Sequence, residues 1–279
     1  MAILPIDSGR YGTKEMLEIF GEQKKVDYQL EIEAAAALSQ GEINLIPKSI
    51  AKDIARAARS GKITAKRIKQ LEAKSDHDTA ALVESLAERC KKESRPWIHY
   101  GLTSNDLVDT SNSMQMRDAI RIIQPKVGKL ALVLTKNAMK YKTLPAVGRT
   151  HGQHASIISF GLKFANWAAE MSTHLERLDE IKKRILICKT LGVVGTGSLM
   201  GKNAVKVQDR VAKKISLFPA KVTTQIIPRE RYAEYIFQLS LLGATLEKIS
   251  IEIRNLQRTE IERLPNTSKK VRWEVVQFL

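Results

Sequence analysis

Apolar residues recur at steps of three and four along most of the chain, which is the spacing of an amphipathic helix. The longest run follows Arg231 and continues without a break through Tyr232, Tyr235, Leu239, Leu242, Leu246, Ile249, Ile253 and Leu256. Period-two runs are rare, and glycine and proline are sparse inside the long segments. The pattern therefore predicts a mostly helical protein, in which this run lines one long helix of a bundle.

Two further long helices are expected beside it. One runs from Ser156 to about Cys188, with Phe160, Phe164, Trp167, Met171, Leu178, Ile181 and Ile185 on one side. The other ends before Thr143 and is kinked near Pro125, because proline removes a helical hydrogen bond. Each helix is entered through a polar loop rich in glycine, threonine and serine, and chemistry is expected in these loops.

Shorter helices are predicted in the first hundred residues, over Glu15 to Ala37, Pro47 to Ala58, Thr64 to Ala73 and Thr79 to Cys90. We therefore expect a small helical N-terminal domain over residues 1–95. A central helical-bundle domain is expected over residues 96–279, with an atypical tail from about residue 264.

Charge changes this picture little. The chain has 46 Lys and Arg against 30 Asp and Glu, a net charge of +16, which fits nucleic acid, an anionic substrate or an acidic partner domain. Basic residues come as scattered pairs mixed with acids, so solvated helix faces are expected and nucleic-acid binding is not. We find no signal peptide pattern and no run of 18 apolar residues, and we expect a cytoplasmic protein without membrane contact.

Four of the five histidines lie in polar segments, namely His77, His99, His151 and His154, whereas mid-helical His174 is expected at the surface. Their concentration beside Thr, Ser, Asp and Gln favours chemistry over packing. No nearby acid or cysteine completes a metal site around His151 and His154, so an acid role without metal is preferred. The two cysteines have no CxxC or CxxH partner and are expected to be reduced and buried.

Two polar segments suggest how a substrate is held. The segment from Thr103 to Asp106 fits a capping box, and a helix N-terminus offers unpaired N–H groups to a substrate carboxylate. The glycine-rich segment from Gly192 to Ser198 lacks the ending of a P-loop. It is either a substrate-facing turn or a plain helix-breaking turn.

In their order along the chain, several motifs resemble the adenylosuccinate lyase family of the fumarase/aspartase superfamily. The longest matches are Trp97-Ile98-His99-Tyr100-Gly101-Leu102-Thr103-Ser104-Asn105-Asp106 and Gly148-Arg149-Thr150-His151-Gly152-Gln153-His154-Ala155. Shorter ones are Arg10-Tyr11, His77-Asp78, Thr224-Gln225 and the segment from Glu252 to Glu260.

The resemblance implies an all-α fold of the fumarase/aspartase type and an enzyme without metal or cofactor. It implies release of fumarate from adenylosuccinate, giving AMP, and from a succinyl-aminoimidazole-carboxamide ribotide of purine biosynthesis. In such a β-elimination a base removes a proton beside a carboxylate and an acid protonates the departing nitrogen. Homotetramers whose sites combine residues from three subunits are implied as well.

Residue roles follow from the same resemblance. His151 matches the general acid, and His77 matches a residue that orients the substrate and assists it. Substrate contacts are implied for Arg10 and Tyr11 at the nucleotide phosphate, Asp78 at the base and succinyl region, Thr103 and Ser104 at a carboxylate, and Gln225, His99 and Thr150 elsewhere.

The family's base is a serine in a mobile loop after the long helix, and this sequence has no such loop after Glu262. The family's C-terminal domain is missing too. A two-base shift in a back-translation of residues 270–279 yields Ser-Gln-Val-Gly-Ser-Ser-Thr-Ile-Pro, which resembles the loop, so a frameshift is one hypothesis. The chain is therefore expected to have little or no lyase activity.

Two rival functions remain open at this point. One is another lyase of the superfamily, acting for example on argininosuccinate, against which Arg10-Tyr11 and the segment from His99 to Asp106 argue. The other is a catalytically dead helical scaffold or nucleic-acid-binding remnant, favoured by the +16 charge and the missing base. Substrate assays distinguish the first rival, and salt-dependent nucleic-acid affinity distinguishes the second.

Overall fold

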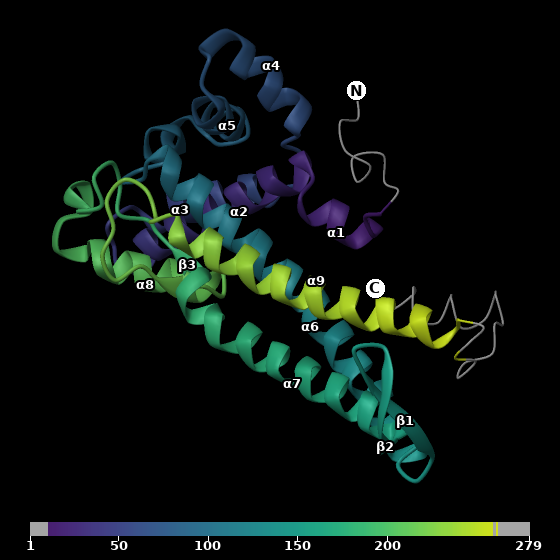
Figure 1. The fold of residues 1–279 in the computed structure, drawn as a ribbon. Coiled ribbons are helices and arrows are strands. Elements are labelled where there is room, and N and C mark those ends of the chain that lie inside the picture. The colour runs from purple at the N-terminus through teal and green to yellow at the C-terminus, as the bar shows by residue number, and fades with distance from the viewer. Residues whose placement is uncertain (1–10, 259–260, 262–279) are drawn as a thin grey trace. The chain divides into compact units, whose positions relative to one another are not determined.

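The computed structural model describes residues 11–258 and 261, and most of them are helical (Figure 1). The chain forms two compact units, which are described separately. Unit 1 comprises residues 1–119 and 183–229, and unit 2 comprises residues 120–182 and 230–279. The division at residue 95 expected from the sequence is a different one and stays a prediction. Among the described residues, no helix is both long and apolar enough to cross a membrane.

Unit 1 is built mainly from short helices and the first part of a long one. In chain order its elements are α1 (Lys14–Ile19), α2 (Glu22–Glu42), α3 (Lys48–Ala58), α4 (Ala65–Ser75), α5 (Asp78–Ala87), the 3-10 helix η2 (Lys92–Trp97), the start of α6 (Ser104–Lys140), β3 (Ile187–Cys188), the 3-10 helix η3 (Ser198–Asn203), α8 (Ala204–Lys214) and β4 (Phe218–Pro219). The strands β3 and β4 pair in parallel.

Small residues let α2 and α3 pack closely in unit 1. A Cβ added at Gly41 would lie 2.6 Å from the Cβ of Ala51, so the glycine permits the approach of the two helices. Alanines 34 to 37 of α2 are buried in the same core. The N-terminus of α4 is capped by Thr64, whose hydroxyl accepts a hydrogen bond from the N–H of Arg67.

Unit 2 contains the second part of α6, the hairpin strands β1 (Pro145–Thr150) and β2 (Gln153–Ser159), α7 (Phe160–Ile185) and α9 (Glu230–Leu256). Its core draws on all three helices and contains Val127, Leu134, Trp167, Met171, Leu242 and Ile249. The predicted seam of α9 is confirmed, because every seventh residue is buried, at Tyr235, Leu242, Ile249 and Leu256. The residues between them on the seam are half-buried.

Two of the expected helix boundaries are corrected by the structure, and a third is confirmed. The helix expected over Glu15 to Ala37 is two helices, because Gly21 has an extended backbone and serves as the N-cap of α2. The helix expected from Ser156 begins only at Phe160, after the end of β2. The third long helix, α6, ends at Lys140 as expected and continues through Pro125.

The sequence analysis did not predict the hairpin that precedes α7. The residues of its turn indicate a hairpin, whereas the residues of its strands show no strand pattern. His151 and Gly152 have φ values of 54° and 75°, as the two central residues of a type I′ turn require. A histidine–glycine pair supplies this geometry, since glycine has no cost at positive φ. The Ser159 hydroxyl then accepts a hydrogen bond from the N–H of Gly161 at 3.1 Å, at the start of α7.

His174 was expected at the surface, and this prediction is wrong. Only 4% of the residue is exposed, and its Nε2 lies 2.9 Å from the Thr245 hydroxyl of α9. Burial lowers the pKa of the imidazole, and the nearby charge of Arg177 lowers it further. The apolar spacing around this residue reflects a face of α7 that is covered by α9.

The buried histidine predicts a pH-dependent stability for unit 2. Because the folded pKa lies below the ordinary value of 6.5, the unfolded chain binds more protons, and the stabilisation present above that value is lost as the pH falls. Urea unfolding should therefore show a lower midpoint at pH 5 than at pH 7.5. The variant His174→Gln should lose part of this difference, whereas His154→Gln, at an exposed position, should keep it. Equal pH dependence in both variants would contradict the prediction.

Candidate active site

The hairpin of unit 2 presents His151 at its tip. The residue lies in the two-residue turn between β1 and β2, and residues 149 to 157 are all exposed. Thr150 ends β1 and pairs with Gln153 in the antiparallel register. Since the turn geometry fixes the backbone of His151, its imidazole is offered to solvent and to any ligand that approaches the tip.

A cavity of about 690 Å³ lies beside this hairpin within unit 2. Its wall includes the basic side chains of Arg149, His154, Lys163 and Arg258. The acid Glu252 is also in the wall, and it accepts a hydrogen bond from the Lys163 ammonium at 2.5 Å. The volume falls in the range of small-molecule sites, and the excess of basic groups suits an anionic ligand.

His77 and Asp78 stand at the N-terminus of α5 in unit 1. The Nδ1 of His77 accepts a hydrogen bond from the N–H of Ala80 at 3.2 Å, so the ring caps the helix. An acceptor at Nδ1 places the proton of the neutral ring on Nε2, and about half of the side chain is exposed. His77 can therefore donate a hydrogen bond to a ligand, as an orienting residue must.

The Thr103–Ser104 turn is the N-terminus of α6. The Thr103 N–H donates to Asp106 Oδ2 at 3.0 Å, which confirms one half of the predicted capping box. Helix α6 begins at Ser104, so the N-terminal end of its dipole favours a bound carboxylate.

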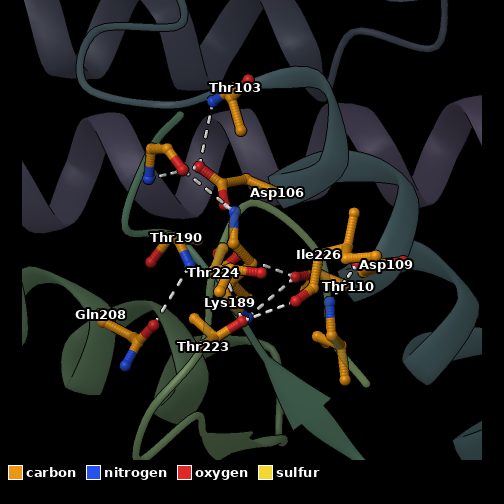
Figure 2. Close-up of polar contacts among 12 residues, drawn as sticks. Thr103, Asp106, Asp109, Thr110, Lys189, Thr190, Gln208, Thr223, Thr224 and Ile226 are labelled. Carbon is orange, nitrogen blue, oxygen red and sulfur yellow. Dashed lines mark hydrogen bonds and ion pairs between the residues drawn. The ribbon is translucent and has the colours of Figure 1, made fainter. Parts of the chain in front are cut away.

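A fully buried ion pair anchors this turn (Figure 2). Neither Asp106 nor Lys189 has exposed side-chain surface, and the Lys189 ammonium donates to Asp106 Oδ1 and to the carbonyl of Gly192. The N–H of Gly192 donates to the other carboxylate oxygen at 2.9 Å. Burial raises the pKa of the Asp106 carboxyl above its ordinary value, against the opposing effect of Lys189. The pair thus ties α6 to the segment that follows β3.

The glycine-rich segment is a tightly packed turn. Gly192 and Gly195 have φ values of 75° and 79°, and a Cβ at Gly195 would lie 2.3 Å from the carbonyl oxygen of Thr223. Only glycine fits there, which favours the second of the two roles expected from the sequence, a turn required by packing. The neighbouring segment from Thr223 to Ile226 carries the candidate Gln225, which is exposed.

His99 makes a structural contact within unit 1, in addition to the substrate contact expected from the sequence. Its backbone has a φ of 61°, and its Nδ1 lies 2.6 Å from Oε1 of the buried Glu33 on α2. Burial lowers the pKa of His99, but the hydrogen bond to Glu33 and the charges of Glu33 and Asp106 together outweigh it, so the pKa is raised. The contact holds the segment that leads into Thr103.

The structure therefore brings some candidates together. Thr103 and Ser104 lie at the start of α6, and the segment of Gln225 is bonded to Asp109 farther along the same helix, while Thr150 and His151 share the hairpin of unit 2. His77 and Asp78 form a separate pair on α5. Tyr11 is 72% exposed. Arg10 lies outside the described residues.

Sequence analysis missed the residues that hold these contacts, chiefly Lys189, Asp109 and Glu33. Lys189 could have been identified from the sequence, because a lysine interrupts the apolar run from Ile185 to Leu191. The cysteines Cys90 and Cys188 are free and buried, as expected. Within residues 11–258 and 261, no group of three or more His, Cys, Asp and Glu side chains is arranged to hold a metal ion.

Comparison with known proteins gives a consistent result. A family model described as lyase matches residues 9–270. The chain is 44% identical to an adenylosuccinate lyase of Methanocaldococcus jannaschii, covering 95% of this chain and 57% of that protein. It is 34% identical to the adenylosuccinate lyase of Thermotoga maritima, covering 94% of this chain and 59% of that one.

Solved structures show the same fold. A fumarate lyase from Mesorhizobium sp. BNC1 aligns with a TM-score of 0.83 at 29% identity, covering 90% of this chain and 60% of that one. A 3-carboxy-cis,cis-muconate lactonizing enzyme from Pseudomonas putida aligns with a TM-score of 0.84 at 28% identity, covering 93% and 59%. The chain thus spans less than two thirds of the length of each of these relatives.

Proposed function

This chain belongs to the lyase family whose model matches residues 9–270, and we propose that it serves a β-elimination that releases fumarate from adenylosuccinate and leaves AMP. The proposal extends to the succinyl-aminoimidazole-carboxamide ribotide, which carries the same succinyl group on its departing nitrogen. The observation that carries it is the presentation of His151 in an exposed, conformationally defined turn, in a chain whose relatives are named adenylosuccinate lyase.

The described residues supply the binding and acid functions of this reaction. A carboxylate of the succinyl group binds at the Thr103–Ser104 turn, where the helix N-terminus stabilises the charge that builds during proton removal. The electron pair of the broken carbon–hydrogen bond forms the double bond of fumarate, and the electron pair of the carbon–nitrogen bond leaves with the nitrogen. His151 gives its proton to the departing nitrogen, and His77 orients the substrate through its Nε2 proton.

The remaining contacts and the setting are part of the same proposal. Arg10 and Tyr11 bind the nucleotide phosphate, Asp78 the base and succinyl region, and Gln225, His99 and Thr150 contribute further substrate contacts. The enzyme acts in the cytoplasm as a homotetramer, with sites completed by neighbouring subunits. The resemblance to the family supports these assignments, and so does the exposed position of Gln225 and Tyr11.

By resemblance to the family, the base of the reaction is a serine in a loop that follows the long helix. We find no match to that loop in these 279 residues. We therefore expect the chain alone to release fumarate slowly. A chimera that joins residues 1–258 to the part of the Methanocaldococcus jannaschii relative that follows the position aligned with residue 258 should be faster by about 10²–10⁴-fold, the usual worth of a positioned base. Fumarate release from adenylosuccinate, with circular dichroism as a check on folding, measures both proteins.

His151 is tested in that chimera. The variant His151→Asn should lose about 10²–10⁴-fold in rate with an unchanged circular dichroism spectrum, because the leaving nitrogen no longer receives a proton. The matched variant His154→Asn, which removes the other exposed imidazole of the hairpin, should lose much less. A folded chimera without fumarate release contradicts the proposed function. Equal losses in the two variants contradict the assignment of the acid to His151.

A further inference from the structure

Asp109 and Arg229 form an ion pair that has no part in the chemistry above. Asp109 lies one turn after Asp106 on α6, and its side chain has no exposed surface. Its Oδ1 accepts a hydrogen bond from Arg229 at 2.6 Å, and its Oδ2 accepts one from the N–H of Ile227 at 2.7 Å. Both oxygens of one carboxylate thus join α6 to the segment 223–229. Figure 2 labels Asp109 together with Thr223, Thr224 and Ile226 of that segment.

The segment 223–229 is fixed at its other end too. The Thr223 hydroxyl donates to the carbonyl of Ile226 at 2.9 Å, and the backbone of Thr223 packs against Gly195. Ile227 is 3% exposed, so it anchors the segment in the core of unit 1. Between these anchors Gln225 is exposed. The anchored backbone therefore presents one amide side chain at a defined place.

We propose that Asp109 is a positioning residue, which holds Gln225 in register with the Thr103–Ser104 turn so that both meet the same substrate. The first two turns of α6 carry the carboxylate contact and Asp109, and a helix transmits their spacing rigidly. This inference rests on the proposed function. Displacement of a substrate contact by about 1 Å can lower the reaction rate by up to about 10²-fold. A buried carboxylate that is bonded to two groups of the segment restricts such a displacement.

The proposal is tested by a double-mutant cycle on the 279-residue chain, with adenylosuccinate as the probe and its dissociation constant measured by calorimetry. Gln225→Ala should weaken binding about tenfold, as expected for loss of a hydrogen bond to a charged ligand. Asp109→Asn should weaken it to a similar degree. If Asp109 acts through Gln225, the double variant should bind no worse than Gln225→Ala alone.

Two further variants serve as controls, one for the role of the ion pair and one for the loss of a positive charge. Arg229→Gln replaces the half-exposed cation by an amide that is still a hydrogen-bond donor, so it should loosen the segment and weaken binding, with circular dichroism as the check on folding. Lys213→Gln removes one positive charge from the exposed C-terminal turn of α8 and should leave affinity unchanged. Amide exchange at Ile227 should become faster in both Asp109→Asn and Arg229→Gln, and remain slow in Lys213→Gln.

The outcomes separate clearly. Additive losses in the double variant, or wild-type affinity in both Asp109→Asn and Arg229→Gln, overturn the positioning role while leaving the proposed function intact. Losses that do not add, together with faster exchange at Ile227, support it. A wild-type chain that does not bind adenylosuccinate contradicts the proposed function itself, and the positioning role falls with it.

Discussion

Replacing Lys189 with alanine is expected to lower the free energy of unfolding of unit 1 by about 3–5 kcal/mol, because it leaves the Asp106 carboxylate buried without its cation. The loss also removes the donor to the carbonyl of Gly192. Urea unfolding followed by circular dichroism measures the effect. Lys183→Ala is the matched control, since that lysine is exposed and lies six residues earlier.

A second variant separates the charge from the packing at this site. Replacing both partners, as Asp106→Leu with Lys189→Met, should recover much of the stability lost in Lys189→Ala, because no unpaired charge is then buried. The double variant still lacks the acceptor for the N–H groups of Thr103 and Gly192. If Lys189→Ala unfolds at the same urea concentration as Lys183→Ala, the buried pair does not have the role assigned to it.

Replacing Trp167 with alanine is expected to destabilise unit 2 by about 3–5 kcal/mol, the usual cost of removing a large aromatic side chain from a core. Trp167 is 4% exposed, packs in the cluster shared by α6, α7 and α9, and meets Phe164 edge to face at 5.5 Å. Thermal unfolding measures the loss. The neighbouring Asn166→Ala, at an exposed position, should change the stability by less than about 1 kcal/mol.

The Trp167 prediction also tests the division of the chain. If the units are distinct cooperative structures, Trp167→Ala should lower the transition of unit 2 more than that of unit 1, as reported by amide exchange in each. A cost below about 1 kcal/mol would mean that the three-helix core does not depend on this side chain.

Much of the helical fold was predictable from periodicity. The seam of α9 was identified residue by residue, because one face of a long helix in a bundle must be apolar at every turn. The hairpin of β1 and β2 was not, since most of its strand residues are exposed and show no alternation. The break at Gly21 was also missed, because a single glycine inside a helical pattern does not by itself mark a helix end.

For the candidate site too, some features could be predicted from the sequence and others could not. His77, Thr103, Ser104 and His151 are candidates because they belong to short polar motifs between apolar helical segments, and their roles stay predictions. The burial of His174 was not foreseen, since one histidine on a helix has no pattern that reveals what covers it. Its partner Thr245 is 71 residues away along the chain.

The sequence by itself determined the helical class, the long seam of α9, the motifs around His151 and Thr103, and the resemblance that led to a lyase. These are local properties, set by spacing along one segment. Only the tertiary structure decided that Lys189 neutralises Asp106, that Asp109 holds the segment of Gln225, and that His151 occupies a type I′ turn. The two ion pairs join residues 83 and 120 positions apart, and the stability of a buried charge depends on which partner the fold brings to it.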